Sequence, residues 1–226
     1  MVFSEELIDF LVGLSANNNR EWFNARKDVY ESVLREPALE YIREVGEPLA
    51  DISPHVRASD RKQGGSLMRI YRDVRFSRDK SPYKTNVGIQ FRHESGKDVH
   101  APGYYVHISI EECFIGAGSW MPDRDALLAY RRAVSEHPNE WLALKQMTES
   151  GEWTLDGHHD MLKRPPRGFS ADDPMIEDIK RKHFIVTHRM DIEDVTAPDF
   201  VDYTVDRFKE SKDWMAFLAQ AIGLPF

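Results

Sequence analysis

The hydrophobic pattern of the chain changes from a helical period to a strand period and back, which limits the folds that the chain can adopt. Apolar residues recur at three- and four-residue spacing in the first fifty residues, alternate with polar residues between 68 and 120, and then return to helical spacing. Helices, consecutive strands and helices again predict an α+β fold. We expect an antiparallel sheet of about four to five strands, with N-terminal and C-terminal helices packed on it.

Local signals predict where the first helices begin and end. Ser4 is a candidate N-cap for the first helix, and Asn18 with Glu21 has the spacing of a capping box for the second. Pro37 suits the first turn of a third helix, which Gly46 and Pro48 are expected to interrupt.

The central segments alternate apolar and polar residues, which is typical of strands with one buried face. The predicted strands span 68–76, 87–93, 103–110 and 113–120, with one more short strand at 183–190. Helices are expected to begin at Pro122 and Pro138, residues 151–171 to form a long loop, and 199–222 to form a helix or helix pair. We predict one domain over residues 1–226, with a helical layer at 1–52, the sheet at 66–120, and helices, loop and short strand at 123–226.

Composition excludes several classes of protein. The net charge of −8 argues against a surface that coats nucleic acid. The single cysteine, Cys113, excludes an internal disulfide and a cysteine-rich zinc site. Acids precede the apolar N-terminal run, which lacks the basic region of a signal peptide, and no apolar stretch approaches the ~20 residues that span a bilayer. We therefore predict a cytoplasmic protein with no membrane contact.

Common catalytic and cofactor motifs are absent from the sequence. It lacks the glycine-rich dinucleotide and P-loop motifs, the HExxH zinc motif, the GxSxG elbow and an EF-hand loop. His158-His159-Asp160 offers metal-binding side chains, but adjacent histidines on a loop need not converge on one ion, and a site needs three or four ligands. We predict no metal and no cofactor.

The most unusual segment is RDVRFSRDKSPYKTN, residues 72–86. Residues 69–84 contain six cations and only two acids, Asp73 and Asp79, in an otherwise acidic chain. In one interpretation the arginines form ion pairs with these and other acids of the chain and stabilise a strand edge. In the other, Pro82 holds a turn while the cations and Tyr83 converge on a phosphate or carboxylate ligand. Exposed ion pairs contribute only about 0–1 kcal/mol, so they explain such a density of charge poorly.

The neighbouring strand supplies a candidate proton carrier. Alternation places Tyr105, His107 and Ser109 on one face, with Gln90 and Arg92 on the adjacent strand, while Gly116 and Gly118 leave room above one face of the next. His107 titrates near neutral pH and is therefore the candidate general acid or base, although a histidine on a wet sheet face often has no such role. The candidate ligand-binding residues are Arg72, Arg75, Lys80, Tyr83, Lys84 and Tyr105.

A second basic cluster, LKRPPRGF at 162–169, places three cations beside two stiffening prolines. A rigid solvated loop and a loop that closes on an anion are both compatible with it.

The motifs NNNREWF, RDVRFSRDKSPYKTN, PGYYVHIS, FIGAGSWMPD and LKRPPRGF, in this order, resemble the conserved hypothetical family called domain of unknown function 2461. The resemblance runs from Phe3 to about Ala221. It implies a single intracellular domain and assigns no substrate, cofactor or catalytic residue.

Three functions are compatible with these observations. The first is binding of a small anionic ligand, phosphorylated or not, in a basic pocket, with or without catalysis. The second is a protein-interaction module that docks an acidic partner, such as the acidic tail of a second copy, through a flat basic strip. The third is single-stranded nucleic-acid binding through Tyr71, Phe76 and Tyr83, which the acidic remainder of the chain makes the weakest. The sequence specifies neither an oligomeric state nor a reaction.

Overall fold

The computed structural model describes residues 2–95, 101–155 and 160–226. They form one six-stranded antiparallel sheet in the order β1-β2-β3-β4-β6-β5. The strands are β1 (Val56–Arg57), β2 (Asn86–His93), β3 (Gly103–Ser109), β4 (Cys113–Ser119), β5 (Trp153–Leu155) and β6 (Phe184–Met190). The predicted α+β class is confirmed, with slightly more strands than expected.

The helices occur before, between and after these strands. They are α1 (Glu5–Ala16), α2 (Arg20–Asn24), α3 (Lys27–Tyr30), α4 (Glu36–Ile52), α5 (Arg124–Glu136), α6 (Pro138–Lys145), α7 (Ile176–Ile179), α8 (Ile192–Thr196), α9 (Phe200–Glu210) and α10 (Lys212–Ala221). A π-helical turn (Glu31–Arg35) joins α3 to α4, and a 3-10 turn (Gln146–Thr148) follows α6. Within the described residues, no helix has both the length and the apolar composition needed to cross a membrane.

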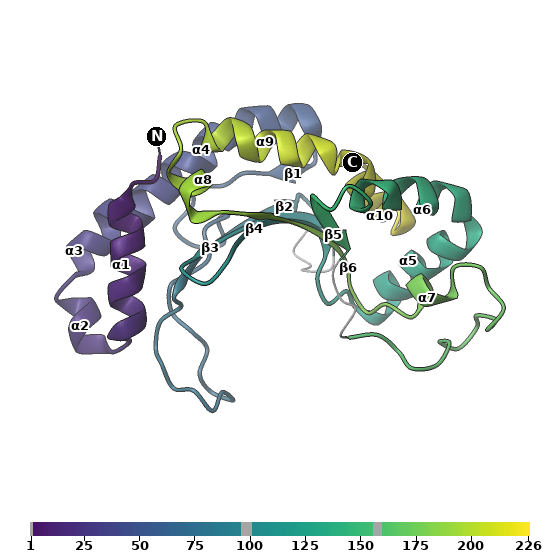
Figure 1. The fold of residues 1–226 in the computed structure, drawn as a ribbon, viewed down its shortest axis with the longest axis horizontal. Coiled ribbons are helices and arrows are strands. Elements are labelled where there is room, and N and C mark those ends of the chain that lie inside the picture. Colours follow the sequence, from purple (N-terminus) through teal and green to yellow (C-terminus); the bar gives the residue numbers. More distant parts are fainter. Residues whose placement is uncertain (1, 96–100, 156–159) are drawn as a thin grey trace.

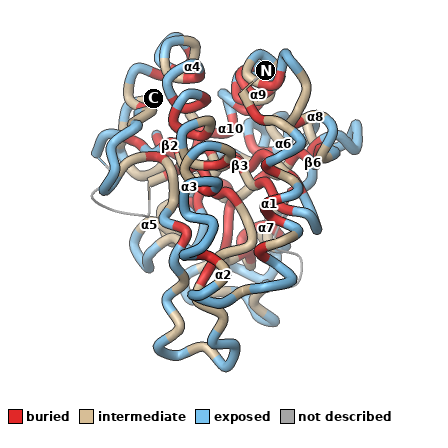
Figure 2. Tube along the Cα trace, turned by 90° about the vertical axis from the view of Figure 1, so that its left-hand side faces the viewer, coloured by how far each residue is buried: buried red, intermediate tan, exposed pale blue. Residues whose placement is uncertain are grey.

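The sheet is arched, and α4 and α9 lie across its convex side (Figure 1). Helices α1–α3 extend from one end of the arch, and α5–α7 lie at the other end. Strand residues that face the convex side pack under α4, α9 and α10. Figure 2 shows the buried segments in red inside an exposed outer layer. Tyr41 of α4 stacks on Phe200 of α9, with ring centroids 5.3 Å apart, and its hydroxyl bonds the Thr204 hydroxyl at 2.8 Å. The helices therefore cover one face of the sheet and leave its concave face for other contacts.

Two predicted helix boundaries were wrong. The N-cap of α2 is Asn19, which accepts the Trp22 backbone N–H at 3.0 Å, and not Asn18. Helix α4 continues through Gly46 and Pro48 to Ile52, because its apolar face, including Val45 and Leu49, is buried along the whole length. Packing of that face outweighs the local cost of proline.

The segment 68–76 is not a strand. It forms one side of a projecting arm, residues 70–84, whose two sides are joined by an isolated β-bridge between Tyr71 and Tyr83 and form no strand pair. The Arg72 N–H donates to the Pro82 carbonyl at 2.9 Å, and the Lys84 N–H donates to the Ile70 carbonyl at 2.7 Å. The place predicted for this strand at the sheet edge is taken by β1, which pairs with β2.

Candidate functional site

Three basic residues of the arm bond acids or a carbonyl oxygen within the arm itself. Arg72 pairs with Asp79, and Arg75 grips Asp73 with Nε and Nη2 at 2.9 and 2.7 Å. The Lys80 ammonium donates to the Val74 carbonyl at 2.9 Å. The Ser81 hydroxyl and the Arg72 guanidinium hold the pKa of Asp79 well below its usual range. For Arg72 and Arg75 the structure matches the ion-pair interpretation of the segment, whereas Lys80 bonds a backbone carbonyl.

Tyr83 anchors the arm to the helices. Its side chain is only 3% exposed and stacks on Phe23, with ring centroids 4.1 Å apart. The Asn18 carboxamide accepts from the Tyr83 N–H at 3.1 Å and donates to its carbonyl at 3.0 Å. Tyr83 therefore cannot stack on a nucleic-acid base without leaving the core.

Lys84 lies at the base of the arm and differs from the other cations. It is half-buried, and its Nζ lies 3.9 Å from the Met68 sulfur. Burial, reinforced by the charge of Arg69, lowers the pKa of its ammonium. Lys84 and Arg72 also border a hollow of about 300 Å³ next to Asn18 and Asn86.

Tyr105 and His107 lie together on the concave face of β3, as strand alternation predicts. The Tyr105 hydroxyl lies 3.2 Å from His107 Nδ1, and the His107 ring stacks on Phe114 at 4.8 Å. Burial raises the pKa of Tyr105 to about 12 and lowers the pKa of His107. The pair is therefore a neutral phenol beside a neutral imidazole, which can accept a proton or a hydrogen bond.

Beside this pair, the register of the strands creates a trough that has glycines on its floor. One cross-strand row reads Arg92, Gly103, Gly118 and Ile185, and the next reads Gln90, Tyr105, Gly116 and Thr187. Missing side chains in the middle of each row leave a cavity of about 480 Å³. Met68, Phe114, Trp120 and Ala101 also line it. This cavity, called the trough below, has mostly apolar walls with a few polar groups, as small-molecule sites commonly do.

The glycines of this face have different structural roles. Gly118 has φ of +134°, and a Cβ there would lie 2.0 Å from the Phe184 carbonyl oxygen, so the backbone requires glycine. A Cβ on Gly88 would lie 2.7 Å from the Tyr105 hydroxyl, so this glycine makes room for the phenol. A Cβ on Gly116 would make only ordinary contacts at 3.9 Å, so at this position a side chain would fill the trough without straining the strand.

Arg92 supplies positive charge to the trough. Its Nε donates to the Gln90 side-chain oxygen at 3.0 Å, and no carboxylate in the described part of the chain pairs with its guanidinium. Trp120, which also lines the trough, is 58% exposed and stacks on His183 at 4.5 Å. The prediction of the site from sequence omitted Arg92 and Trp120, although alternation and the Gly116–Gly118 pair both pointed to this face.

The predicted site residues therefore divide into two groups. Tyr105 lines the trough. His107 contacts two residues that line it, Tyr105 and Phe114, and Lys84 contacts another, Met68. Arg72, Arg75, Lys80 and Tyr83 belong to the arm and do not line the trough. Among residues 2–95, 101–155 and 160–226, no group of three or more histidine, cysteine or acidic side chains could hold a metal ion. His158 and His159 lie outside the described residues, and Asp160 bonds Lys182 and His183.

Comparisons with known proteins give a family and no activity. A search of curated proteins found no match. Residues 6–217 match the family described as conserved hypothetical protein (DUF2461). The match covers all six described strands and most of the helices before and after them in the sequence, so the chain belongs to the DUF2461 family.

Proposed function

We propose that this protein binds a small organic anion with a flat apolar body in the trough on the concave face of its sheet. The observation that carries the proposal is the glycine floor beside Arg92, a guanidinium without a carboxylate partner among the described residues. An arginine fork grips carboxylate, sulfonate or phosphate groups in two hydrogen bonds.

The walls of the trough favour a planar ligand. Tyr105, Phe114 and Trp120 contribute aromatic rings to the lining, and Gly116 lets a ring approach the backbone of β4. Aromatic faces contribute both buried area and a preferred stacking geometry. Gln90 and Thr187 offer polar groups that orient the bound molecule. His107, in contact with Tyr105 and Phe114, stays the predicted general acid or base if the ligand is a substrate.

A fluorescent probe of this chemistry is 8-anilinonaphthalene-1-sulfonate, which has an aromatic body and one sulfonate. We expect it to bind the folded protein. Arg92→Gln should weaken binding about tenfold, the effect of losing one charge-assisted contact. Gly116→Val should weaken binding at least tenfold, because the side chain occupies the trough. Titration of probe fluorescence measures each dissociation constant.

The matched control is Arg189→Gln, which removes an exposed arginine from the same face of the sheet but outside the trough. It should bind the probe as the parent protein does. Equal affinity in Gly116→Val and the parent protein would reject the trough as the binding site.

The arm supports a second candidate function, docking onto the acidic surface of another copy of the chain. Phe76 is 95% exposed near the tip of the arm, between Arg75 and Arg78, and the arm projects away from the sheet (Figure 1). Exposed aromatic residues beside arginine are common anchors of interfaces. We expect sedimentation at 50 mM salt to show a dimer that dissociates at 500 mM salt and in Phe76→Ser. Val29→Ser, which removes a different exposed apolar side chain, is the control. A monomer at low salt would contradict this candidate.

A further inference from the structure

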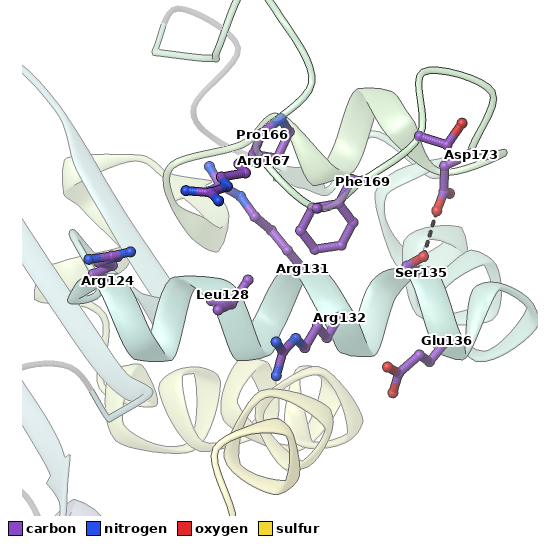
Figure 3. A pocket seen from close by; sticks show the side chains of 12 residues that line it. Arg124, Leu128, Arg131, Arg132, Ser135, Glu136, Pro166, Arg167, Phe169 and Asp173 are labelled. Carbon is purple, nitrogen blue, oxygen red and sulfur yellow. Dashed lines mark hydrogen bonds between the residues drawn. The ribbon is translucent and has the colours of Figure 1, made fainter.

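Another cavity lies between α5 and the loop that precedes α7, and it shares no lining residue with the trough. It measures about 640 Å³. Arg124, Leu128, Arg131 and Ser135 line it from α5 at spacings of four, three and four residues, which place them on one side of a helix. Pro166, Arg167, Phe169 and Asp173 line it from the loop, as Figure 3 shows.

The loop is held over α5 by contacts on both sides of the cavity. The Leu162 N–H donates to the Lys180 carbonyl at 2.9 Å, and Phe169 packs against the core. The Ser135 hydroxyl donates to the Asp173 carboxylate, the bond drawn dashed in Figure 3. The cavity is therefore formed before any ligand arrives.

Arg131 is a buried cation without a counter-charge. Its side chain rises from α5 toward Pro166 and Arg167 (Figure 3), and the residue is 9% exposed. One Nη2 hydrogen bond reaches the Arg181 carbonyl at 2.9 Å, while the buried Nε has no hydrogen-bond partner. Among the described side chains, no carboxylate lies within ion-pair distance of it. Burial lowers the pKa of this guanidinium, with no opposing charge to offset the effect.

Two of the nearby acids, Asp178 and Asp173, already bond other groups. Asp178 accepts from Trp141 Nε1 and Lys145 Nζ, both at 2.8 Å, and from Arg181 Nε at 3.0 Å. Asp173 accepts from Ser135 and, at 2.8 Å, from the Met175 N–H. Asp178 is thus neutralised without Arg131, and Asp173 is used to hold the loop.

A buried charge without a partner is strongly destabilising, so natural proteins either pair such a group or use it to bind a ligand. Three further arginines line the same cavity, Arg124, Arg132 and Arg167, and none of them forms an ion pair with a described residue. Arg132 and Glu136 extend on the other side of α5 in Figure 3, so they border the cavity without filling its centre. Three guanidinium groups around one cavity repel one another unless an anion lies between them.

We propose that this cavity binds the phosphate group of a small phosphorylated molecule. Arg131 and Arg167 would grip the phosphate oxygens, and Arg124 would add charge at the end where α5 begins. Phe169 and Leu128 would contact the organic part of the molecule, for which a cavity of this size leaves room beyond one phosphate. The proposal is independent of the trough, because the two cavities share no lining residue.

The probes are inorganic phosphate and phenyl phosphate, titrated by isothermal calorimetry at constant ionic strength. We expect both to bind, and phenyl phosphate to bind more tightly because of Phe169. Arg167→Gln, on the exposed side of the loop, should weaken binding at least tenfold. Arg164→Gln removes an equally exposed arginine three residues away that does not line the cavity, and it should bind as the parent protein does.

Arg131→Met separates binding from a structural role. The thioether side chain fills the same volume without charge, so the melting temperature should stay the same or rise while phosphate binding is lost. If this variant fails to fold, phosphate binding by Arg167→Gln alone tests the proposal. The proposal is overturned if neither probe binds at millimolar concentration, or if Arg164→Gln weakens binding as much as Arg167→Gln. It is also overturned if Gly116→Val abolishes phenyl phosphate binding, since the probe would then occupy the trough.

Discussion

Asp178 and Glu177 are adjacent acids of α7 whose surroundings are opposite. The Asp178 carboxylate is buried and accepts three hydrogen bonds, whereas Glu177 forms an exposed pair with Lys180 at 2.6 Å. The hydrogen bonds from Lys145, Trp141 and Arg181 outweigh burial and keep the pKa of Asp178 below its ordinary value. We therefore expect the stability of the fold to depend on the Asp178 carboxylate but not on that of its neighbour Glu177.

We predict that Asp178→Asn lowers the free energy of unfolding by about 3–5 kcal/mol, because it removes the charge of a buried ion pair. Glu177→Gln, the matched control, should change it by less than about 1 kcal/mol. Urea denaturation followed by tryptophan fluorescence measures both. An equal decrease in the free energy of unfolding in the two variants would show that the buried hydrogen bonds of Asp178 stabilise the fold no more than an exposed ion pair does.

Asn18 shows why some residue roles do not follow from local sequence. Its spacing from Glu21 predicts a helix cap, but its carboxamide bonds both backbone groups of Tyr83, 65 residues away. The neighbouring Asn19 makes the cap. A local pattern identifies residue types that can cap, whereas the choice between two adjacent asparagines depends on which one meets the arm in the folded chain.

At the scale of elements, helices with strong local signals were predicted well. Asp123 caps α5 and accepts from the Ala126 N–H at 2.8 Å, Pro138 begins α6, and the predicted pair at 199–222 is α9 and α10. The strands β2, β3, β4 and β6 also follow from alternation. The short strands β1 and β5 were missed, because two or three residues carry no period and become strands only by pairing with β2 and β6.

The candidate site was predicted only in part, because local sequence patterns indicate strand faces but not which charged groups meet in the fold. Alternation placed Tyr105 and His107 on one face, and the Gly116–Gly118 pair indicated space above a strand. The density of cations at 69–84 gave a stronger signal, but Arg72 and Arg75 are paired within the arm. Net charge along a sequence does not reveal which cations lack a partner, so the unpaired Arg92 and the buried Arg131 emerge only from the fold.

Each face of the sheet holds a histidine that burial affects, half-buried His107 on one and buried His188 on the other, so acid sensitivity is a property of the whole molecule. His107 lies on the concave face, and His188 lies under the helices with its Nε2 2.7 Å from the Tyr203 hydroxyl. Burial lowers the pKa of each below the ordinary value of about 6.5. Unfolding exposes both, so as the pH falls below about 6.5 the unfolded chain binds protons that the native protein excludes.

The free energy of unfolding should therefore fall from pH 7 to pH 5.5, by at most about 1.4 kcal/mol per pH unit for each histidine. Carboxyl groups whose pKa is lowered, such as that of Asp178, remain ionised throughout this range and do not contribute. Urea denaturation at pH 7.0, 6.25 and 5.5 gives the slope. His107→Gln should make the slope shallower, since glutamine binds no proton in either state, and His107→Gln with His188→Gln should make it shallower again. A slope that both variants leave unchanged would mean that these imidazoles titrate alike in the folded and unfolded chains, and that the sheet does not shield them from water.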